Sequence, residues 1–223
     1  MKGLEGKVAL VTGGGRGIGR AIALALAARG VSVVVTGRDE RSLGETVGEI
    51  AYGGGKARHL AGDVRDRAHL LATVERALSV FGGLDIVVAA ARTCGPVDAA
   101  DDDRAEAIFA TNLVAVHATF QTALPRMRAP GSLLVVSGCA AGSLHPGGAT
   151  VACRASQAGV AGLVQALAAE VGPKGITCNA VVPSSRQGEE IEPEQVADVV
   201  VLLCSSAMRG VTGQVISVAP PSG

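Results

Sequence analysis

Short runs of Val, Ile and Leu alternate along the whole chain with longer stretches rich in Ala, Leu and Arg. Gly or Asp bounds the apolar runs, and the stretches between them are long enough for helices that cross back over a sheet. This pattern predicts an α/β fold, a doubly wound and mostly parallel sheet of about seven strands with helices on both faces. We expect strands at 8–12, 31–36, 57–61, 84–89, 132–137, 177–182 and 214–218, and helices at 17–29, 40–51, 66–81, 101–127, 150–171 and 193–206.

Composition supports one folded domain over residues 1–223. The chain is 48% hydrophobic and 18% charged, which argues against disorder. Its 20 basic and 20 acidic residues balance, so we expect no general attraction to nucleic acid or to anionic membranes. No apolar run approaches the roughly 18 residues of a membrane span, and no signal peptide is evident, so we expect a cytoplasmic protein. Five cysteines without a C-x-x-C pair indicate neither a disulfide framework nor a metal site.

A glycine-rich loop, TGGGRGIG at 12–19, directly follows the first expected strand and opens the first expected helix. In that position a glycine loop brings backbone amides and a helix N-terminus to a pyrophosphate group. The same residues could also form a tight turn from strand to helix without any ligand. The position between strand and helix favours phosphate binding.

This loop resembles the T-G-x-x-x-G-I-G fingerprint of the classical short-chain dehydrogenase/reductase (SDR) family, whose fold is Rossmann-like. Other family motifs follow in order over nearly the whole chain: GDV at 62–64, LDIV at 84–87, TNL at 111–113, ASQAG at 155–159, NAVVP at 179–183 and TGQ at 212–214. The resemblance implies a nicotinamide cofactor. It assigns cofactor contacts in the glycine loop, after the third strand and after the fourth strand to Gly13, Gly15, Arg16, Ile18, Asp63, Val64 and Ala89.

The end of the second expected strand bears on the choice of cofactor. Gly37 stands where the resemblance places a carboxylate in NAD-preferring members, so nothing there repels a 2′-phosphate. Arg38, beside it, and Arg16, in the glycine loop, could grip that phosphate through charge-assisted hydrogen bonds. We therefore expect NADP(H) rather than NAD(H). The alternative is that both arginines are solvated surface residues.

The proton relay that the resemblance implies is not complete in this chain. The family uses a tyrosine as proton donor and a lysine one helical turn later, which holds the nicotinamide ribose and lowers the phenol pKa. Alignment on the ASQAG motif places Cys153 at the tyrosine position and Gln157 at the lysine position. The single tyrosine, Tyr52, lies before the third expected strand. A thiol is also much shorter than a phenol, so reach disfavours Cys153 as a substitute acid.

The two remaining relay positions are also altered or open to another interpretation. The serine position falls on Gly138, with Ser137 one residue away and expected on the opposite side of the strand. Asn112 is retained, but an asparagine inside a helix could equally cap or kink that helix. The catalytic residues are therefore unknown, and Asn112, Gly138, Cys153 and Gln157 are the equivalent positions.

Two further features distinguish the nicotinamide end. The family's N-N-A-G segment reads AAAR at 89–92, which puts Arg92 in the place of a glycine beside the cofactor. Arg92 could occlude the nicotinamide pocket, replace the lost lysine charge, bind an anionic ligand group or lie solvated in a loop. The segment 184–193 is shorter than the substrate-covering lid of relatives, so a closed and dry reaction chamber is hard to build.

These observations predict an NADP(H)-binding protein of the SDR type with impaired redox chemistry, acting as a partner subunit, a ligand-responsive protein or a non-redox catalyst. The alternative is an atypical oxidoreductase that reduces a carbonyl or activated alkene with a proton from the substrate or from Cys153. A third reading is a structural subunit that binds no nucleotide. The resemblance implies a homodimer or homotetramer that pairs the helices at 101–127 and 150–171, although packing on the sheet explains their apolar positions equally well. A hetero-oligomer with another family member is also open.

Overall fold

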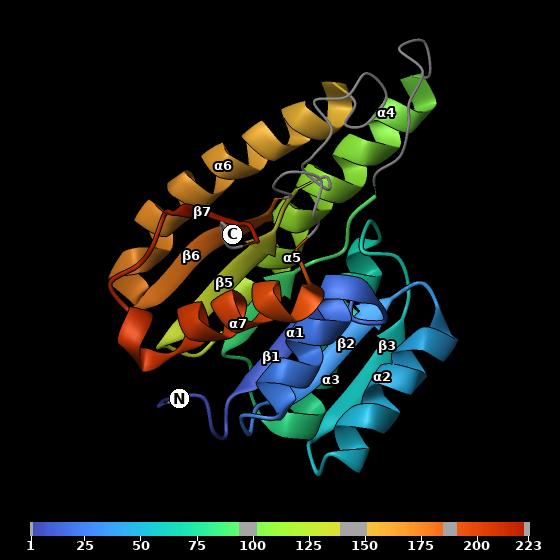
Figure 1. Ribbon diagram of the computed structural model, residues 1–223, viewed down its shortest axis with the longest axis vertical. Helices are drawn as coiled ribbons and strands as arrows, with labels where there is room; N and C mark the ends of the chain where they lie inside the picture. Colours follow the sequence, from blue (N-terminus) through green and yellow to red (C-terminus); the bar gives the residue numbers. More distant parts are fainter. Residues whose placement is uncertain (1, 94–101, 139–150, 185–190, 221–223) are drawn as a thin grey trace.

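In the computed structural model, which describes residues 2–93, 102–138, 151–184 and 191–220, seven parallel strands form one sheet of order β3-β2-β1-β4-β5-β6-β7 (Figure 1). The strands are β1 Val8–Thr12, β2 Ser32–Gly37, β3 Ala57–Ala61, β4 Ile86–Ala89, β5 Gly131–Val136, β6 Ile176–Pro183 and β7 Val215–Val218. The main helices are α1 Gly17–Ala27, α2 Glu40–Tyr52, α3 Arg67–Phe81, α4 Asp102–Phe109, α5 Ala115–Ala123, α6 Val151–Val171 and α7 Pro193–Cys204. The predicted doubly wound α/β fold is confirmed.

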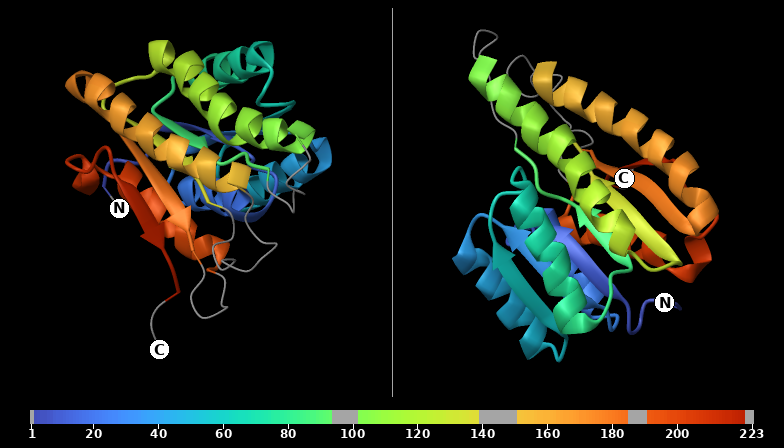
Figure 2. Two further views of the ribbon diagram at one scale, coloured as in Figure 1. Left: turned by 90° about the horizontal axis from the view of Figure 1, so that it is seen from above. Right: turned by 180° about the vertical axis from the view of Figure 1, so that it is seen from behind.

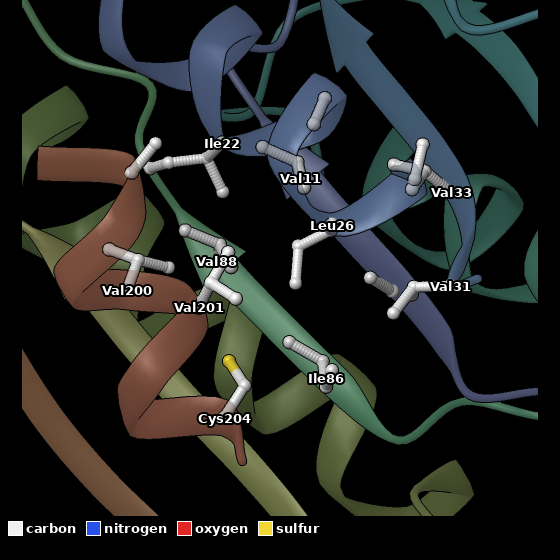
Figure 3. Packing of buried hydrophobic residues seen from close by; sticks show 14 of the residues in the cluster. Val11, Ile22, Leu26, Val31, Val33, Ile86, Val88, Val200, Val201 and Cys204 are labelled. Carbon is white, nitrogen blue, oxygen red and sulfur yellow. The ribbon is translucent and has the colours of Figure 1, made fainter. Parts of the chain in front are cut away.

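Helices cover both faces of the sheet, as Figure 2 shows. Side chains of α1, α2 and α7 pack on one face, and side chains of α3, α5 and α6 pack on the other. In Figure 3, Ile22 and Leu26 of α1 lie beside Val200 and Val201 of α7, over Val88 of β4. Each of these five side chains is fully buried, and burial of one such side chain stabilises a fold by about 1.5–3 kcal/mol. Sandwiching the sheet between two apolar layers holds its carboxyl edge in a fixed shape.

The long helix predicted at 101–127 is not continuous. A π-helical segment, Ala110–Val114, separates α4 from α5, and a 3-10 turn, Leu124–Arg126, ends the run. Wider turns of this kind occur mostly where a helix must admit an insertion or serve a site. The prediction of one regular helix was therefore wrong at its centre, and the interruption falls on Asn112.

The segment Asp103–Arg126 is long and apolar enough to cross a membrane by length and composition alone. Several of its apolar side chains, however, belong to the protein core. Phe120 and Ala123 are fully buried in the cluster that covers one face of the sheet. One such helix, which packs partly on the sheet, is weak evidence for a membrane span. Of the expected short lid at 184–193, residues 185–190 lie outside the described part of the chain.

Candidate functional site

The glycine loop between β1 and α1 passes very close to neighbouring backbone at the carboxyl edge of the sheet. Gly13 has a φ of 69°, and a Cβ there would lie 2.8 Å from the backbone nitrogen of Ala91. A Cβ at Gly19 would overlap the carbonyl oxygen of Gly13. The Gly13 and Gly14 amides donate to the carbonyl oxygen of Thr36, at 2.7 and 3.2 Å. These glycines therefore make a cradle that side chains would fill, as close approach to a phosphate requires.

The N-terminus of α1 differs from those of the next two helices. Asp39 and Asp66 cap α2 and α3 by accepting hydrogen bonds from first-turn amides. Arg16, the N-cap residue of α1, is extended and makes no side-chain cap hydrogen bond. First-turn amides without a capping oxygen carry the positive end of the helix dipole. Together with the cradle, they fit an anionic group such as a pyrophosphate.

The end of β2 places exposed positive charge next to this loop. Gly37 ends the strand, and Arg38 is exposed directly after it. Within the described part of the chain, no hydrogen bond or ion pair engages the Arg38 guanidinium, although its charge helps to lower the pKa of Asp63. The nearby Asp39 carboxylate is occupied in capping α2, through the amides of Arg41 and Ser42. Arg38 is therefore placed to meet a further anion.

Beyond β3, the carboxylate of Asp63 is already engaged by an arginine. Arg65 binds both of its oxygens, with Nη2 to Oδ2 at 2.6 Å and Nε to Oδ1 at 3.1 Å. This pairing is the main cause that lowers the pKa of Asp63, so the group is ionised at neutral pH. An adenine amino group would therefore share the carboxylate with Arg65. Val64 is buried against Leu70, Ala115 and Ala118 and fixes the strand end.

His69, on α3, contacts the end of β2 and the segment that follows β3. Its Nε2 lies 2.7 Å from Thr36 Oγ1, and Thr36 Oγ1 itself donates to the Leu60 carbonyl oxygen at 2.8 Å. The histidine is therefore the donor to Thr36 and carries its proton on Nε2. Burial lowers the pKa of His69, which favours this neutral form. A Cβ at Gly62 would overlap the His69 ring, so that glycine makes room for the histidine.

At the carboxyl edge of the sheet, beside β4 and β5, a pocket brings the relay-equivalent positions together. Its described lining comprises residues from β5, α6, the π-helical segment and the segment after β4: Ala91, Arg92, Asn112, Val116, Val136, Ser137, Gly138, Cys153, Ser156 and Gln157. All four positions expected from sequence are included. The space among these residues is about 10 Å³, comparable to one water molecule. The predicted assembly of the four positions in one place agrees with this geometry, while their catalytic roles stay predictions.

The substituted residues on α6 differ in their surroundings. Cys153 is only 2% exposed and packs with Ile108 and Ala152 in a small apolar cluster. Ser156, which is also buried, donates its hydroxyl to the Cys153 carbonyl oxygen at 2.8 Å. Gln157 is half-buried and brings a neutral carboxamide to the pocket. In the described lining, a phenol and an ammonium group are both missing.

At the serine-equivalent position, the backbone has a conformation that favours glycine. Gly138 has a φ of 153°, which L side chains rarely adopt, and a Cβ there would lie 3.3 Å from the Pro183 carbonyl oxygen. Ser137, one residue earlier, donates its amide to the Val181 carbonyl oxygen at 3.0 Å and lines the pocket. A serine side chain at position 138 would therefore be strained in this conformation. Ser137 is also among the residues that line the pocket, while the expected direction of its side chain stays a prediction.

Asn112 clamps the chain after β4. Its Oδ1 accepts from the Thr93 amide, and its Nδ2 donates to the Thr93 carbonyl oxygen, both at 2.8 Å. On the other side of the same segment, Thr12 Oγ1 accepts from the amides of Ala90 and Ala91, each at 3.1 Å. Both polar atoms of the Asn112 amide are thus committed to the backbone. The structure favours a positioning role and places it on the widened turn of the helix.

Sequence reasoning missed two of these contacts. Arg65, which binds Asp63, had one available signal, because an aspartate often accepts a hydrogen bond from the amide two residues later, and Asp63 does so at 2.9 Å. The role of Thr12 carried a weaker signal, its place at the head of the glycine motif. The expected contacts Ile18 and Ala89 lie in the first turn of α1 and at the end of β4, both next to the glycine loop in the fold.

Comparisons with known proteins agree with this architecture. The profile of the short chain dehydrogenase family matches residues 7–193. A 7alpha-hydroxysteroid dehydrogenase of Clostridium sardiniense is 33% identical over 188 residues, 82% of this chain and 72% of that protein. A hydroxynaphthalene reductase-like protein of Metarhizium guizhouense is 38% identical over 186 residues, 82% of this chain and 69% of that protein. A short chain dehydrogenase from Burkholderia cenocepacia, solved in complex with NADP, has a TM-score of 0.88 at 30% identity and 97% coverage of both chains.

Proposed function

Because this chain belongs to the short-chain dehydrogenase family, we propose that it binds NADP(H) through an intact adenosine side while its proton relay is impaired. It then acts as a partner subunit, a ligand-responsive protein or a non-redox catalyst. One observation carries the proposal. The four positions line a single pocket, and the resemblance to the family assigns two of them, Cys153 and Gln157, to the acid and the cation.

The adenosine side supports the nucleotide part of the proposal. The uncapped amides at the start of α1 and the glycine cradle fit the pyrophosphate, and Arg16 and Arg38 lie at the edge where a 2′-phosphate would add charge. Asp63 and Val64 would hold the adenine. When bound, the nucleotide would supply a hydride from its nicotinamide ring. The chain's own residues on this side bind and orient, and none of their contacts depends on the substituted positions.

The nicotinamide side supports the impaired relay. Cys153 packs among apolar neighbours, and Gln157 can bond ribose hydroxyls but brings no charge that would tune a neighbouring acid. Loss of a general acid slows such a reaction by roughly 10²- to 10⁴-fold. This loss corresponds to about 3–5 kcal/mol of additional barrier. Hydride transfer is therefore slow unless the substrate or solvent provides the proton.

Thermal unfolding with nucleotides tests the binding claim. One-site binding at a hundredfold excess over Kd stabilises the native state by about 2.7 kcal/mol. For a chain of this size, that raises the Tm by about 5–11 °C. We expect this rise with NADPH, and no rise at millimolar NADPH would refute nucleotide binding.

The variant Arg38→Asp tests the phosphate contact. We expect it to weaken NADP(H) at least about tenfold, the loss of a hydrogen bond to a charged group, and to leave NAD(H) little changed. Arg41→Gln is the matched control, because the Arg41 guanidinium already pairs with Glu45 at 3.0 Å. Equal loss of both nucleotides in Arg38→Asp would contradict a role in binding the 2′-phosphate.

The second candidate function is an atypical NADP(H)-dependent oxidoreductase acting on a carbonyl or activated alkene. The names of two relatives, a dehydrogenase and a reductase, favour it. NADPH oxidation followed by absorbance over a panel of ketones and enones separates the candidates. We expect turnover at most at trace rates. Ordinary turnover that Cys153→Ala abolishes would replace the first candidate by the second.

We also propose that the protein assembles through α4 and α6 as a homodimer or homotetramer, or with another family member. Val114, at the end of the π-helical segment, is 57% exposed, and Val151, at the start of α6, is 85% exposed. Light scattering after size-exclusion chromatography tests this assembly. A monomer at micromolar concentration, in both the purified protein and the Val114→Glu variant, would refute it.

A further inference from the structure

The pocket at the nicotinamide end combines one cation with neutral groups. Arg92 lines it together with Asn112, Ser137, Cys153 and Gln157. A guanidinium group is protonated at every physiological pH, so its charge does not depend on the surroundings. The part of the lining that the structure describes contains no carboxylate. Among the described residues, the lining therefore presents a positive charge with no carboxylate beside it.

The backbone that carries Arg92 is held on both sides. Thr12 Oγ1 fixes the amides of Ala90 and Ala91 before it, and the Asn112 amide fixes both backbone atoms of Thr93 after it. The side chain itself is exposed, and no ion pair or hydrogen bond engages it within the described ranges. The backbone at Arg92 is thus pre-organised, while the guanidinium N–H groups bond to no described part of the chain. Pre-organisation of this kind lowers the entropy cost of binding a ligand.

We propose that Arg92 binds the carboxylate of a small ligand at the mouth of this pocket, so that the site selects organic acids over neutral carbonyl compounds. The inference rests on the proposed function in placing that ligand beside the nucleotide. The planar guanidinium fork matches a carboxylate with two parallel hydrogen bonds. Gln157 and Ser137 supply neutral polar groups for the rest of the ligand. The space among the lining residues is about 10 Å³, so the ligand's carboxylate would lie at the mouth, and the pocket itself takes only a group of about the size of a water molecule.

Calorimetric titration of the full chain tests the proposal with matched probes. Acetate and pyruvate are compared with acetamide and pyruvamide at constant ionic strength, with and without saturating NADP⁺, and inorganic phosphate is a separate arm. We expect at least one acid to bind at least about tenfold more tightly than its amide, the effect of one charge-assisted contact. Arg92→Gln should remove this preference, and Arg92→Lys should retain part of it through charge without the fork. Arg76→Gln, the same charge change at an exposed position on α3, should leave it unchanged.

Three results would overturn the assignment: equal binding of acids and amides, an undiminished preference in Arg92→Gln, or phosphate binding as tightly as the best acid. Circular dichroism and the Tm of each variant establish folding first, and Arg92→Lys keeps the test valid where Arg92→Gln unfolds. Acid selectivity without any response to NADPH would refute the proposed function and leave the Arg92 assignment in place. A normal NADPH response without acid selectivity would refute the Arg92 assignment and leave the proposed function in place.

Discussion

Replacing Asn112 distinguishes a backbone clamp from a member of a proton relay. Its side chain makes two hydrogen bonds of 2.8 Å to Thr93, and each such bond contributes about 0.5–1.5 kcal/mol net. Asn112 is half-buried, so water replaces part of what Asn112→Ala removes. We expect a loss of about 1–2 kcal/mol in the free energy of unfolding and a fall of about 2–8 °C in Tm.

Asn112→Asp is the sharper variant because it has the same shape. The new carboxylate still accepts from the Thr93 amide, but it sets an oxygen without a proton against the Thr93 carbonyl oxygen. At pH 7 we expect a larger loss than in Asn112→Ala, about 2–4 kcal/mol in all. Protonation restores an O–H donor, so folding raises the pKa of the new carboxyl above its unfolded value near 3.9. The deficit is therefore full above the folded-state pKa and shrinks as the pH falls through it.

Denaturant unfolding at pH 7.5 and pH 5, with the unmodified protein measured at each pH, gives these free energies. Hydrogen exchange of the Thr93 amide reports the clamp directly and should speed up in Asn112→Ala. The reasoning is refuted if Asn112→Ala leaves both stability and Thr93 protection unchanged, or if the deficit of Asn112→Asp does not shrink at lower pH. A residue that acted in the relay alone would alter turnover without altering stability.

Two further substitution pairs test the packing of the glycine loop and of the opposite edge of the sheet. Gly19→Ala puts a methyl group against a loop carbonyl and should cost about 1–3 kcal/mol and weaken NADP⁺ binding, whereas Gly44→Ala, in α2 with nothing within 4 Å, should stabilise by about 0.5–1 kcal/mol. Denaturant unfolding with and without NADP⁺ measures both, and a neutral Gly19→Ala would count against close approach. Asp85→Asn breaks a buried carboxylate's pairing with Arg128 at 2.5 Å and should cost about 1–3 kcal/mol, because Arg128 is half exposed. Glu75→Gln, in an exposed pair, should cost under about 0.5 kcal/mol by the same assay, and equal losses would contradict a role for burial.

The strands were predictable because their composition follows from burial. A parallel strand covered on both faces needs apolar residues at successive positions, and the runs at 8–12 and 57–61 match β1 and β3 in both bounds. The run at 84–89 begins two residues too early. Asp85 precedes the strand, and its carboxylate accepts from the Val8 amide at 2.8 Å. Such a contact joins residues far apart in the chain and leaves no local periodic signal.

The grouping of these residues was predictable from the sequence, whereas their contacts were not. The resemblance to the family predicted that Gly138, Cys153 and Gln157 belong to one site, and one pocket contains them, while their catalytic roles stay predictions. The break in the long helix contains Asn112, whose hydrogen bonds go to Thr93 in a different part of the chain, and no helical period indicates such a contact. Gly138, with its φ of 153°, likewise lies beside Pro183, which is far from it in the sequence. Tertiary contact decided each of these features.

Nucleotide affinity and chemical rate depend on different strands of this sheet. The loops after β1, β2 and β3 supply the amides and charges expected to bind adenosine, while the relay-equivalent positions lie after β5, on α6 and on the π-helical segment. With the relay impaired as we propose, the substitutions at Cys153 and Gln157 would raise the reaction barrier by about 3–5 kcal/mol without removing any group that would hold the pyrophosphate. Because an interaction equally strong in ground and transition states affects binding and not the chemical step, tight NADPH binding is no evidence of turnover here. In our proposal the nucleotide would change the stability and the ligand affinity of the protein rather than drive turnover, and Arg92, in the segment after β4, is the charged residue that would bind the second ligand.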